Sequence, residues 1–221
     1  MKLKREGRRG PMRMTMTVHH LENSRSQRVL WMLEELDIPY AVRFYERDKE
    51  TMLAPPELRK VHPLGKSPVI DVEGQVIAET GAIVEYLVER ADGRLGPPPH
   101  RDAVLRYRFW LHYAEGSLMP PLLLKLVLGR IPLIGKKVAQ RIQPMIDNHL
   151  DFVESELASR PWFAGDQFSA ADIMMSFPLE AARKRAGLDN SRPATIAWLD
   201  KIHARPAYQL ALEHGGPYAY A

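Results

Sequence analysis

The chain has 221 residues, 45% of them hydrophobic, so it can bury a core large enough for one large domain or two small ones. Its formal charge of +4 arises in residues 1–13, where six basic residues and one acidic residue give +5 and leave −1 for the remainder. A basic arm can contact nucleic-acid phosphates, but a disordered leader, or a chain start placed upstream of Met14 or Met16, is the simpler explanation. We therefore treat residues 1–14 as a leader and expect no nucleic-acid partner.

The sequence contains no cysteine, which excludes structural disulfides, thiolate metal sites and redox mechanisms that use a protein thiol. Any sulfur chemistry must therefore come from a ligand. The eight histidines include no helical pair at the i, i+4 spacing of a metalloprotease, so we predict no metal. The leader lacks a secretory signal core, and no stretch approaches the roughly 20 apolar residues of a membrane span, so we expect a cytoplasmic protein.

Residues 15–92 alternate short apolar strands with amphipathic helices, which predicts an α/β domain with the order βαβαββα around a small mixed sheet. The expected strands are Met16–His20, Tyr40–Tyr45, Pro68–Val72 and Gln75–Ala78, and the expected helices are Ser24–Leu36, Pro56–Val61 and Thr80–Arg90.

Residues 93–100 include three consecutive prolines, which cannot continue a helix, and so predict a linker. Residues 101–221 predict an all-helical domain. Its expected helices are Ala103–Ser117, Lys136–Ser159 with a kink at Pro144, Ala170–Arg185 and Pro193–Ala204, with irregular helix over Leu118–Ile134. Ser169 and Asp172 have the spacing of a helix capping box, a folding signal to which we assign no catalytic role.

Hydroxyl and amide side chains gather where the first strand meets the first helix, at Asn23 and Ser24. A helix N-terminus supplies free N–H groups and about half a positive charge. A ligand thiol beside Ser24 would ionise more readily there, because the hydroxyl can donate to sulfur and the dipole favours the anion. Asn23 is a second candidate donor, and Ser24 alone would also suit an ordinary N-cap.

Two further segments could hold a peptide-like anion. Pro68 stands just before a strand, and a cis bond there would expose the Ser67 main chain to an extended ligand, with Lys66 facing its carboxylate. At the start of the third helix, Thr80 can bind a carboxylate while Glu79 accepts from an ammonium group, which together suit an amino acid head group. A surface lysine and a second N-cap are the plainer interpretations.

Four segments together resemble the cytosolic glutathione transferases, and the similarity runs from about residue 16 to about residue 210. They are the Val-His-His-Leu-Glu-Asn-Ser-Arg-Ser-Gln-Arg stretch, His-Pro-Leu-Gly-Lys-Ser-Pro-Val-Ile, Ala-Glu-Thr-Gly-Ala-Ile-Val-Glu-Tyr-Leu, and the capping box. The resemblance implies a thioredoxin-like first domain that binds glutathione as co-substrate, a helical domain that shapes a pocket for a small apolar electrophile, and a homodimer.

The resemblance also implies site residues. Ser24 would take the thiolate-stabilising position, Lys66 and Ser67 would contact the glycyl and cysteinyl parts, and Glu79 with Thr80 the γ-glutamyl end. One departure is the apolar segment Thr51-Met-Leu-Ala, where many members have a polar contact to the glycyl carboxylate. Either His62 or Lys66 would replace that contact, or the affinity for glutathione would be lower. The first helix of the second domain would present Trp110, Tyr113 and Ser117 to the electrophile, with the Tyr113 phenol polarising a leaving group.

Three functions remain open at this point. The first is attack of glutathione thiolate on an electrophile, with peroxide reduction at the same site. The second is disulfide exchange in which two glutathione molecules replace the missing protein thiol. The third is a non-catalytic module that keeps the fold for interaction.

Overall fold

The computed structural model describes residues 16–221, so the predicted leader over residues 1–14 lies outside the described residues. Four strands form one sheet in the order β2-β1-β3-β4, in which β1 pairs with β2 in parallel and β3 pairs with both β1 and β4 in antiparallel. The strands are β1 (Met16–Leu21), β2 (Ala41–Tyr45), β3 (Val69–Val72) and β4 (Gln75–Ala78). This confirms the predicted mixed sheet.

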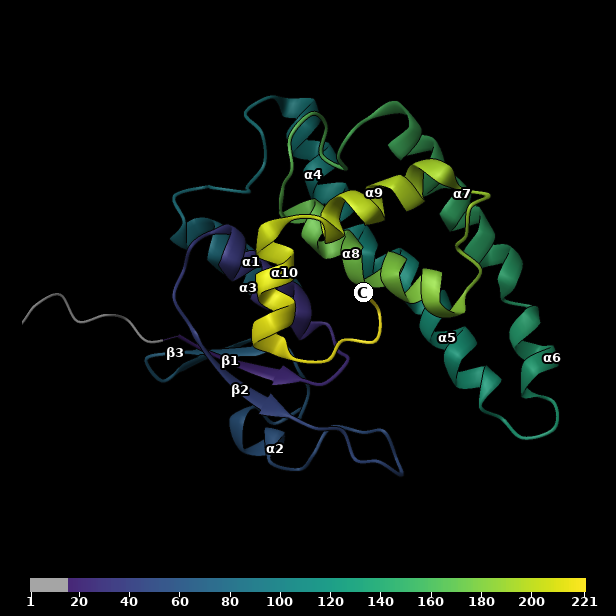
Figure 1. Ribbon diagram of the computed structural model, residues 1–221, viewed down its shortest axis with the longest axis horizontal. Helices are drawn as coiled ribbons and strands as arrows, with labels where there is room; N and C mark the ends of the chain where they lie inside the picture. Colours follow the sequence, from purple (N-terminus) through teal and green to yellow (C-terminus); the bar gives the residue numbers. More distant parts are fainter. Residues whose placement is uncertain (1–15) are drawn as a thin grey trace, which may run out of the picture.

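Helices cover both faces of the sheet (Figure 1). They are α1 (Ser26–Glu35) and α3 (Thr80–Arg90) on one face and the short α2 (Leu58–Val61) on the other. The main hydrophobic core lies on the α1 and α3 face and continues into the helical domain, whereas α2 buries only a small cluster against Leu21 and Tyr45. The predicted order βαβαββα is therefore observed.

The rest of the described chain is helical. It contains α4 (Arg101–Tyr113), the π-helix η1 (Ala114–Leu118), α5 (Met119–Gly129), α6 (Gly135–Gln140), α7 (Gln143–Ser159), α8 (Ala170–Arg185), α9 (Pro193–His203) and α10 (Pro206–Gly215). No helix among residues 16–221 combines the length and apolarity needed to cross a membrane.

Two expectations for this half need correction, and one helix was missed. The kinked helix expected over residues 136–159 is two helices, and Pro144 lies in the first turn of α7, where a missing N–H costs nothing. The segment after residue 118 is not irregular but forms the regular helix α5, again with proline in its first turn. Helix α10 was not predicted.

The capping box is present as predicted: the Ser169 side chain and the Asp172 side chain each bond the other residue's main chain at the start of α8. Helix α10, at the end of the chain, packs along α1, where the Trp31 and Tyr208 rings meet edge to face with centroids 5.2 Å apart. In Figure 1 this yellow helix lies beside α1, over the sheet. The C-terminal part of the helical domain therefore covers the domain that carries the predicted ligand site.

Candidate functional site

The sheet register brings the three predicted ligand segments to one end of the sheet. His19 of β1 pairs with Val69 of β3, and Val69 pairs with Ala78 of β4. Because both pairs are antiparallel, the residues that follow β1, precede β3 and follow β4 all leave the sheet at the same end. Residues 22–26, 66–68 and 79–80 therefore meet there.

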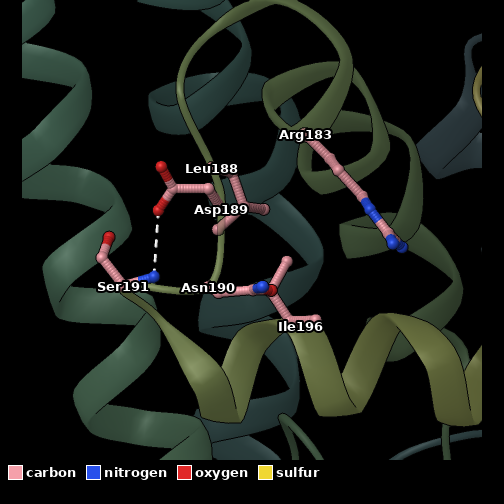
Figure 2. Close-up of a pocket in the computed structure, with 6 residues that line it drawn as sticks. All are labelled: Arg183, Leu188, Asp189, Asn190, Ser191 and Ile196. Atoms are coloured by element: carbon pink, nitrogen blue, oxygen red, sulfur yellow. Dashed lines mark hydrogen bonds between the residues drawn. The ribbon is translucent and has the colours of Figure 1, made fainter.

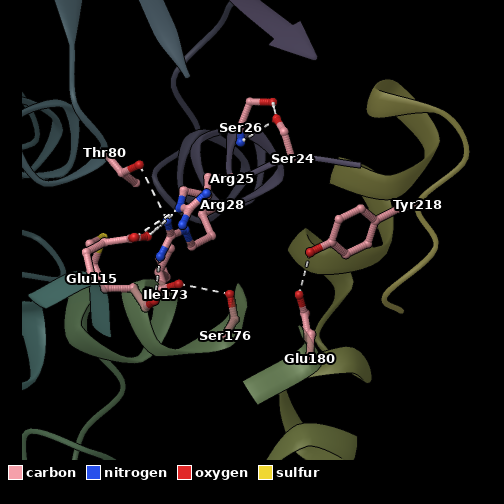
Figure 3. Close-up of polar contacts among 11 residues, drawn as sticks. Ser24, Arg25, Ser26, Arg28, Thr80, Glu115, Ile173, Ser176, Glu180 and Tyr218 are labelled. Carbon is pink, nitrogen blue, oxygen red and sulfur yellow. Dashed lines mark hydrogen bonds and ion pairs between the residues drawn. The ribbon is translucent and has the colours of Figure 1, made fainter. Parts of the chain in front are cut away.

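The first segment begins its helix later than expected. Helix α1 begins at Ser26, and Ser24 lies in the preceding turn with only 5% of its surface exposed. The Ser24 Oγ lies 2.7 Å from the Ser26 Oγ and accepts from the Ser26 main-chain N–H at 3.2 Å. Figure 3 shows the two serine side chains pointing toward one another. Ser24 is thus at the start of α1, as predicted, but its hydroxyl already has partners.

The alternative donor, Asn23, also has partners. Its backbone has a positive φ of 49°, its amide nitrogen donates to Glu22 at 3.3 Å, and its amide oxygen accepts from the main-chain N–H of Ala219 at 2.7 Å. The C-terminal segment after α10 therefore lies directly against the residue next to Ser24.

The second segment has the geometry that the sequence suggested. The Ser67–Pro68 peptide bond is cis, and β3 begins one residue later at Val69. The Ser67 hydroxyl donates to the carbonyl of His19 at 2.8 Å, which fixes this turn to β1. Because Ser67 precedes the paired residues of β3, its peptide group lies outside the sheet ladder, at the end of the sheet.

Lys66 and His62 lie in the same connection. Lys66 is exposed, whereas His62 is half-buried and accepts from the Leu64 N–H at 3.4 Å, within the turn after α2. The structure thus brings Lys66 close to Ser67, and it gives the His62 ring a role in holding the turn.

The third segment has an unusual backbone. Glu79 is exposed and adopts φ 73° and ψ 125° between β4 and α3, a conformation that a residue with a Cβ rarely takes. Such outliers persist where the surroundings impose them, and they concentrate at ligand sites. Thr80, which follows, is 4% exposed, and its hydroxyl accepts from the Arg28 guanidinium at 3.4 Å.

A cluster of charged residues that the sequence analysis missed joins the two domains behind this site (Figure 3). Arg28 of α1 is 1% exposed, donates to the carbonyl of Met174 at 2.7 Å and pairs with Glu115 of η1. Arg25 donates to both oxygens of Glu115 at 2.9 and 3.0 Å. Burial raises the pKa of Glu115, but Arg28 and Arg25 outweigh this and hold that pKa below its usual value.

The helical turn at η1 explains how Glu115 reaches α1. A π-turn places one extra residue in a helix and turns the following side chains, and such turns are frequent at functional sites. Two arginines three residues apart, Arg25 just before α1 and Arg28 within it, were the available signal in the sequence, but nothing in the sequence paired them with Glu115.

The predicted electrophile residues lie on α4 and η1, the first helical segments of the second domain. The Tyr113 hydroxyl bonds His149 of α7, and Trp110 stacks on Phe152 with ring centroids 5.4 Å apart. Burial raises the pKa of Tyr113 to about 12. These two side chains pack among aromatic rings between α4 and α7, and Trp110 also lines a hollow there, so their place in an electrophile pocket stays a prediction. Ser117 is half-buried in η1, two residues beyond Glu115.

The C-terminal segment contributes another unpredicted group. Tyr218 donates to the buried carboxylate of Glu180 at 2.6 Å, and Tyr208 donates to the same carboxylate at 2.7 Å. Tyr220 accepts from Arg185 at 2.9 Å. Figure 3 shows the Tyr218 ring directed at Glu180. These bonds hold in place the C-terminal segment whose Ala219 contacts Asn23.

Two hollows lie within the helical domain, away from the sheet end. One of about 520 Å³ lies between the end of α8 and α9 and is lined by Arg183, Leu188, Asp189, Asn190, Ser191 and Ile196 (Figure 2). Another of about 380 Å³ lies between α4 and α7, beside Phe109, Trp110 and Phe152. Neither contains Ser24, Ser67 or Thr80. Among residues 16–221, no three His, Asp or Glu side chains gather closely enough to hold a metal ion.

Comparison with known proteins agrees with this arrangement. Residues 24–90 match the model of the glutathione S-transferase N-terminal domain, and residues 136–208 match that of the C-terminal domain. Glutathione S-transferase 3 of Schizosaccharomyces pombe is 35% identical over 210 residues, covering 89% of this chain and 86% of that protein.

Solved structures give the same result. A glutathione S-transferase from Actinobacillus pleuropneumoniae is 33% identical and superposes with a TM-score of 0.84, covering 93% of this chain and 95% of the other. The glutathione transferase URE2P6 of Phanerochaete chrysosporium, solved with oxidized glutathione, shares the fold at 23% identity with a TM-score of 0.76, covering 93% of this chain and 97% of the other. The two domain matches together with the 35% identical relative show that this chain is a member of the glutathione S-transferase family.

Proposed function

We propose that this protein is a glutathione transferase, which activates the thiol of bound glutathione for attack on a small apolar electrophile. The observation that carries the proposal is the convergence of three segments at one end of the sheet: the turn before α1, the cis peptide at Ser67–Pro68 and the strained turn at Glu79. A tripeptide with a thiol in its middle residue, a carboxylate at one end and an amino acid head group at the other fits this set of groups.

Each part of the tripeptide has a chemical counterpart. The Ser67 main chain pairs with the cysteinyl residue as an added strand, and Lys66 faces the glycyl carboxylate. Thr80 at the start of α3 holds the γ-glutamyl carboxylate, where free N–H groups favour an anion, while Glu79 accepts from the ammonium group. Arg28 supports Thr80 from behind.

The sulfur then lies beside Ser24 at the start of α1. A thiolate there is favoured by the helix dipole and by a hydroxyl donor, and each unit by which the thiol pKa falls corresponds to about 1.4 kcal/mol. The thiolate attacks the electrophilic carbon, so that a C–S bond forms while the leaving group departs with its electron pair or the electrons move into an acceptor. The protein also holds the reactants in position.

Ser24 is the stronger of the two candidate donors. The Asn23 amide groups are held by Glu22 and by the main chain of Ala219, whereas the Ser24 hydroxyl bonds only within its own turn. Calorimetry should show that the parent protein binds reduced glutathione. Conjugation of 1-chloro-2,4-dinitrobenzene near neutral pH should slow about tenfold in Ser24→Ala, with glutathione affinity retained. A larger loss in Asn23→Ala than in Ser24→Ala contradicts the assignment.

A second candidate is disulfide exchange between two glutathione molecules, which the complex of a fold relative with oxidized glutathione favours. Tighter binding of oxidized than reduced glutathione, together with turnover of a mixed disulfide, would identify this activity. Glutathione-dependent peroxide reduction would use the same thiolate.

A third candidate is a module that binds glutathione without catalysis, which the near-complete burial of Ser24 favours. Normal glutathione affinity with no conjugation, peroxidase or exchange activity would identify it. In all three cases we propose a cytoplasmic protein that works as a homodimer, as the family resemblance implies.

A further inference from the structure

The Ser24 hydroxyl begins a buried chain of hydrogen bonds. Its Oγ is 2.7 Å from the Ser26 Oγ, which in turn is 2.9 Å from the Nδ1 of His20. Ser24, Ser26 and His20 are 5%, 0% and 2% exposed. With so little access to solvent, each hydrogen in the chain is directed by its protein partners.

The far end of the chain sets the tautomer of His20. His20 also forms a hydrogen bond with the main chain of Gly215 at the end of α10. This bond raises the pKa of His20, which means that the ring donates the hydrogen and the Gly215 carbonyl accepts it. A Cβ on Gly215 would lie 3.3 Å from the Nε2, so Nε2 is the nitrogen that faces Gly215. Burial lowers the pKa of His20 to about 4, so at neutral pH the ring has a single hydrogen, on Nε2.

The tautomer determines the direction of both serine hydroxyls. With Nδ1 unprotonated, Ser26 donates its one hydrogen to Nδ1 or, at 3.4 Å, to the carbonyl of Leu21. Its oxygen also accepts from the Leu21 N–H at 3.2 Å. Ser26 then has no hydrogen for Ser24, so in their 2.7 Å contact Ser24 must be the donor.

We infer that Ser26 and His20 are positioning residues, which hold the hydroxyl hydrogen of Ser24 away from the bound sulfur and so set how readily glutathione ionises. The inference rests on the proposed function and assigns a role to two residues outside the predicted ligand contacts. In this arrangement the Ser24 hydroxyl can stabilise a thiolate only in competition with its bond to Ser26. Donation to sulfur requires the hydrogen to leave Ser26.

The expected effect of removing the Ser26 hydroxyl distinguishes a positioning role from a purely structural one. Removing the Ser26 hydroxyl takes away the competing acceptor, so the Ser24 hydrogen becomes free to donate to sulfur. Ser26→Ala should therefore lower the pKa of the bound thiol by about one unit, the effect of one hydrogen bond to a charged acceptor. Ser24→Ala should raise it, and the double variant should match Ser24→Ala.

The experiment is an ultraviolet titration of the thiolate of bound glutathione in the parent, the two single variants and the double variant, each first checked for glutathione affinity by calorimetry. Ser176→Ala is the matched control, because Ser176 is a buried serine whose hydroxyl bonds a helix carbonyl at 2.9 Å. A second measurement needs no substitution: nitrogen-15 NMR of the imidazoles in the parent protein should show His20 with hydrogen on Nε2 and none on Nδ1.

The outcomes are distinct. A lower thiol pKa in Ser26→Ala, cancelled in the double variant, supports the inference. An unchanged or raised pKa in Ser26→Ala, or a His20 ring protonated on Nδ1, overturns it while the proposed function stands, provided that Ser24→Ala raises the pKa. If the parent binds no glutathione, or if Ser24→Ala leaves the thiol pKa unchanged, the assignment of Ser24 and this inference both fail.

Discussion

His20 shows how much the chemistry of one side chain depends on its surroundings. It lies on β1 with 2% of its surface exposed, between the Ser26 hydroxyl, the ring of Phe44 and the main chain of Gly215. From the sequence, His19 and His20 are simply neighbours that point to opposite faces of a strand. The partner that fixes the tautomer of His20 comes from α10, almost 200 residues later, so residue patterns could not reveal it.

The lowered pKa of His20 predicts a pH dependence of stability. Burial brings the folded-state pKa to about 4, below the usual 6.5, so between these values the unfolded chain binds more protons than the folded one. The contribution of neutral His20 is therefore complete above pH 6.5 and is lost as the pH falls toward 4, by about 3 kcal/mol in total. Urea unfolding should show the parent losing that much more stability than His20→Gln, which does not titrate. Parallel curves for the two proteins would contradict the prediction.

At the scale of elements, the start of α8 is the capping box that the sequence predicted, and the structure gives Asp172 further partners. The capping box alone is a cap that stabilises by about 1 kcal/mol. In the structure the Asp172 carboxylate also accepts from the N–H of Phe163 at 3.0 Å and from the Trp198 indole at 3.3 Å. It is therefore a junction between α8, α9 and the turn before α8.

A matched pair of variants separates these contributions. Ser169→Ala removes only part of the cap and should lower the free energy of unfolding by about 1 kcal/mol. Asp172→Ala leaves several buried donors without an acceptor and should lower it by about 3 kcal/mol or more. Equal losses in urea unfolding would show that the bonds to Phe163 and Trp198 contribute nothing.

The contact between α1 and η1 depends on Arg28 and Glu115. Removing one member of a buried pair strands the other, which typically costs about 3 to 5 kcal/mol, and we expect the lower end because the Glu115 side chain is 33% exposed. Arg28→Met should therefore lower the free energy of unfolding by about 3 kcal/mol. Arg183→Met, which breaks an exposed ion pair with Asp200, should lower it by less than about 1 kcal/mol. A loss of similar size in both variants would mean that the buried pair has no special role.

The elements that could be predicted share a local signal. Clear apolar periodicity, with turn residues at the ends, marks the four strands and also the helices α3 and α8. The bounds of α3 and α8 agree with the prediction. The break before α7 was missed because Pro144 suits both a kink and a first turn, and only packing decides between them. Helix α10 was missed because its apolar face depends on α1, which is distant in the sequence.

At the scale of the whole molecule, the ligand segments could be predicted from local motifs, whereas the residues that hold them in place could not. Ser24, the cis peptide before Pro68 and the turn at Glu79 were each suggested by a local motif, and the sheet register brings them together. The groups behind them, Arg28 with Glu115 and Tyr218 with Glu180, pair residues that are far apart in the chain. Single-sequence reasoning could place the first set at one site but could not pair the second.

The predicted homodimer is also a property of the whole molecule. An apolar groove between α4 and α7, lined in part by the half-exposed Phe109, gives one exposed surface on which a second copy could pack. Light scattering coupled to size exclusion at micromolar concentration should give twice the chain mass of 25.2 kDa. A measured mass equal to that of a single chain would contradict the prediction. In that case Phe109→Asp should leave the measured mass unchanged.

The central claim is that glutathione lies across this end of the sheet with its sulfur beside Ser24. A crystal structure of the parent protein with reduced glutathione tests this most directly. We predict the sulfur within hydrogen-bonding distance of the Ser24 Oγ, the cysteinyl main chain paired with Ser67, and the γ-glutamyl carboxylate at Thr80. Glutathione bound elsewhere, or at this end of the sheet with its sulfur directed at Asn23 or away from α1, would contradict the account.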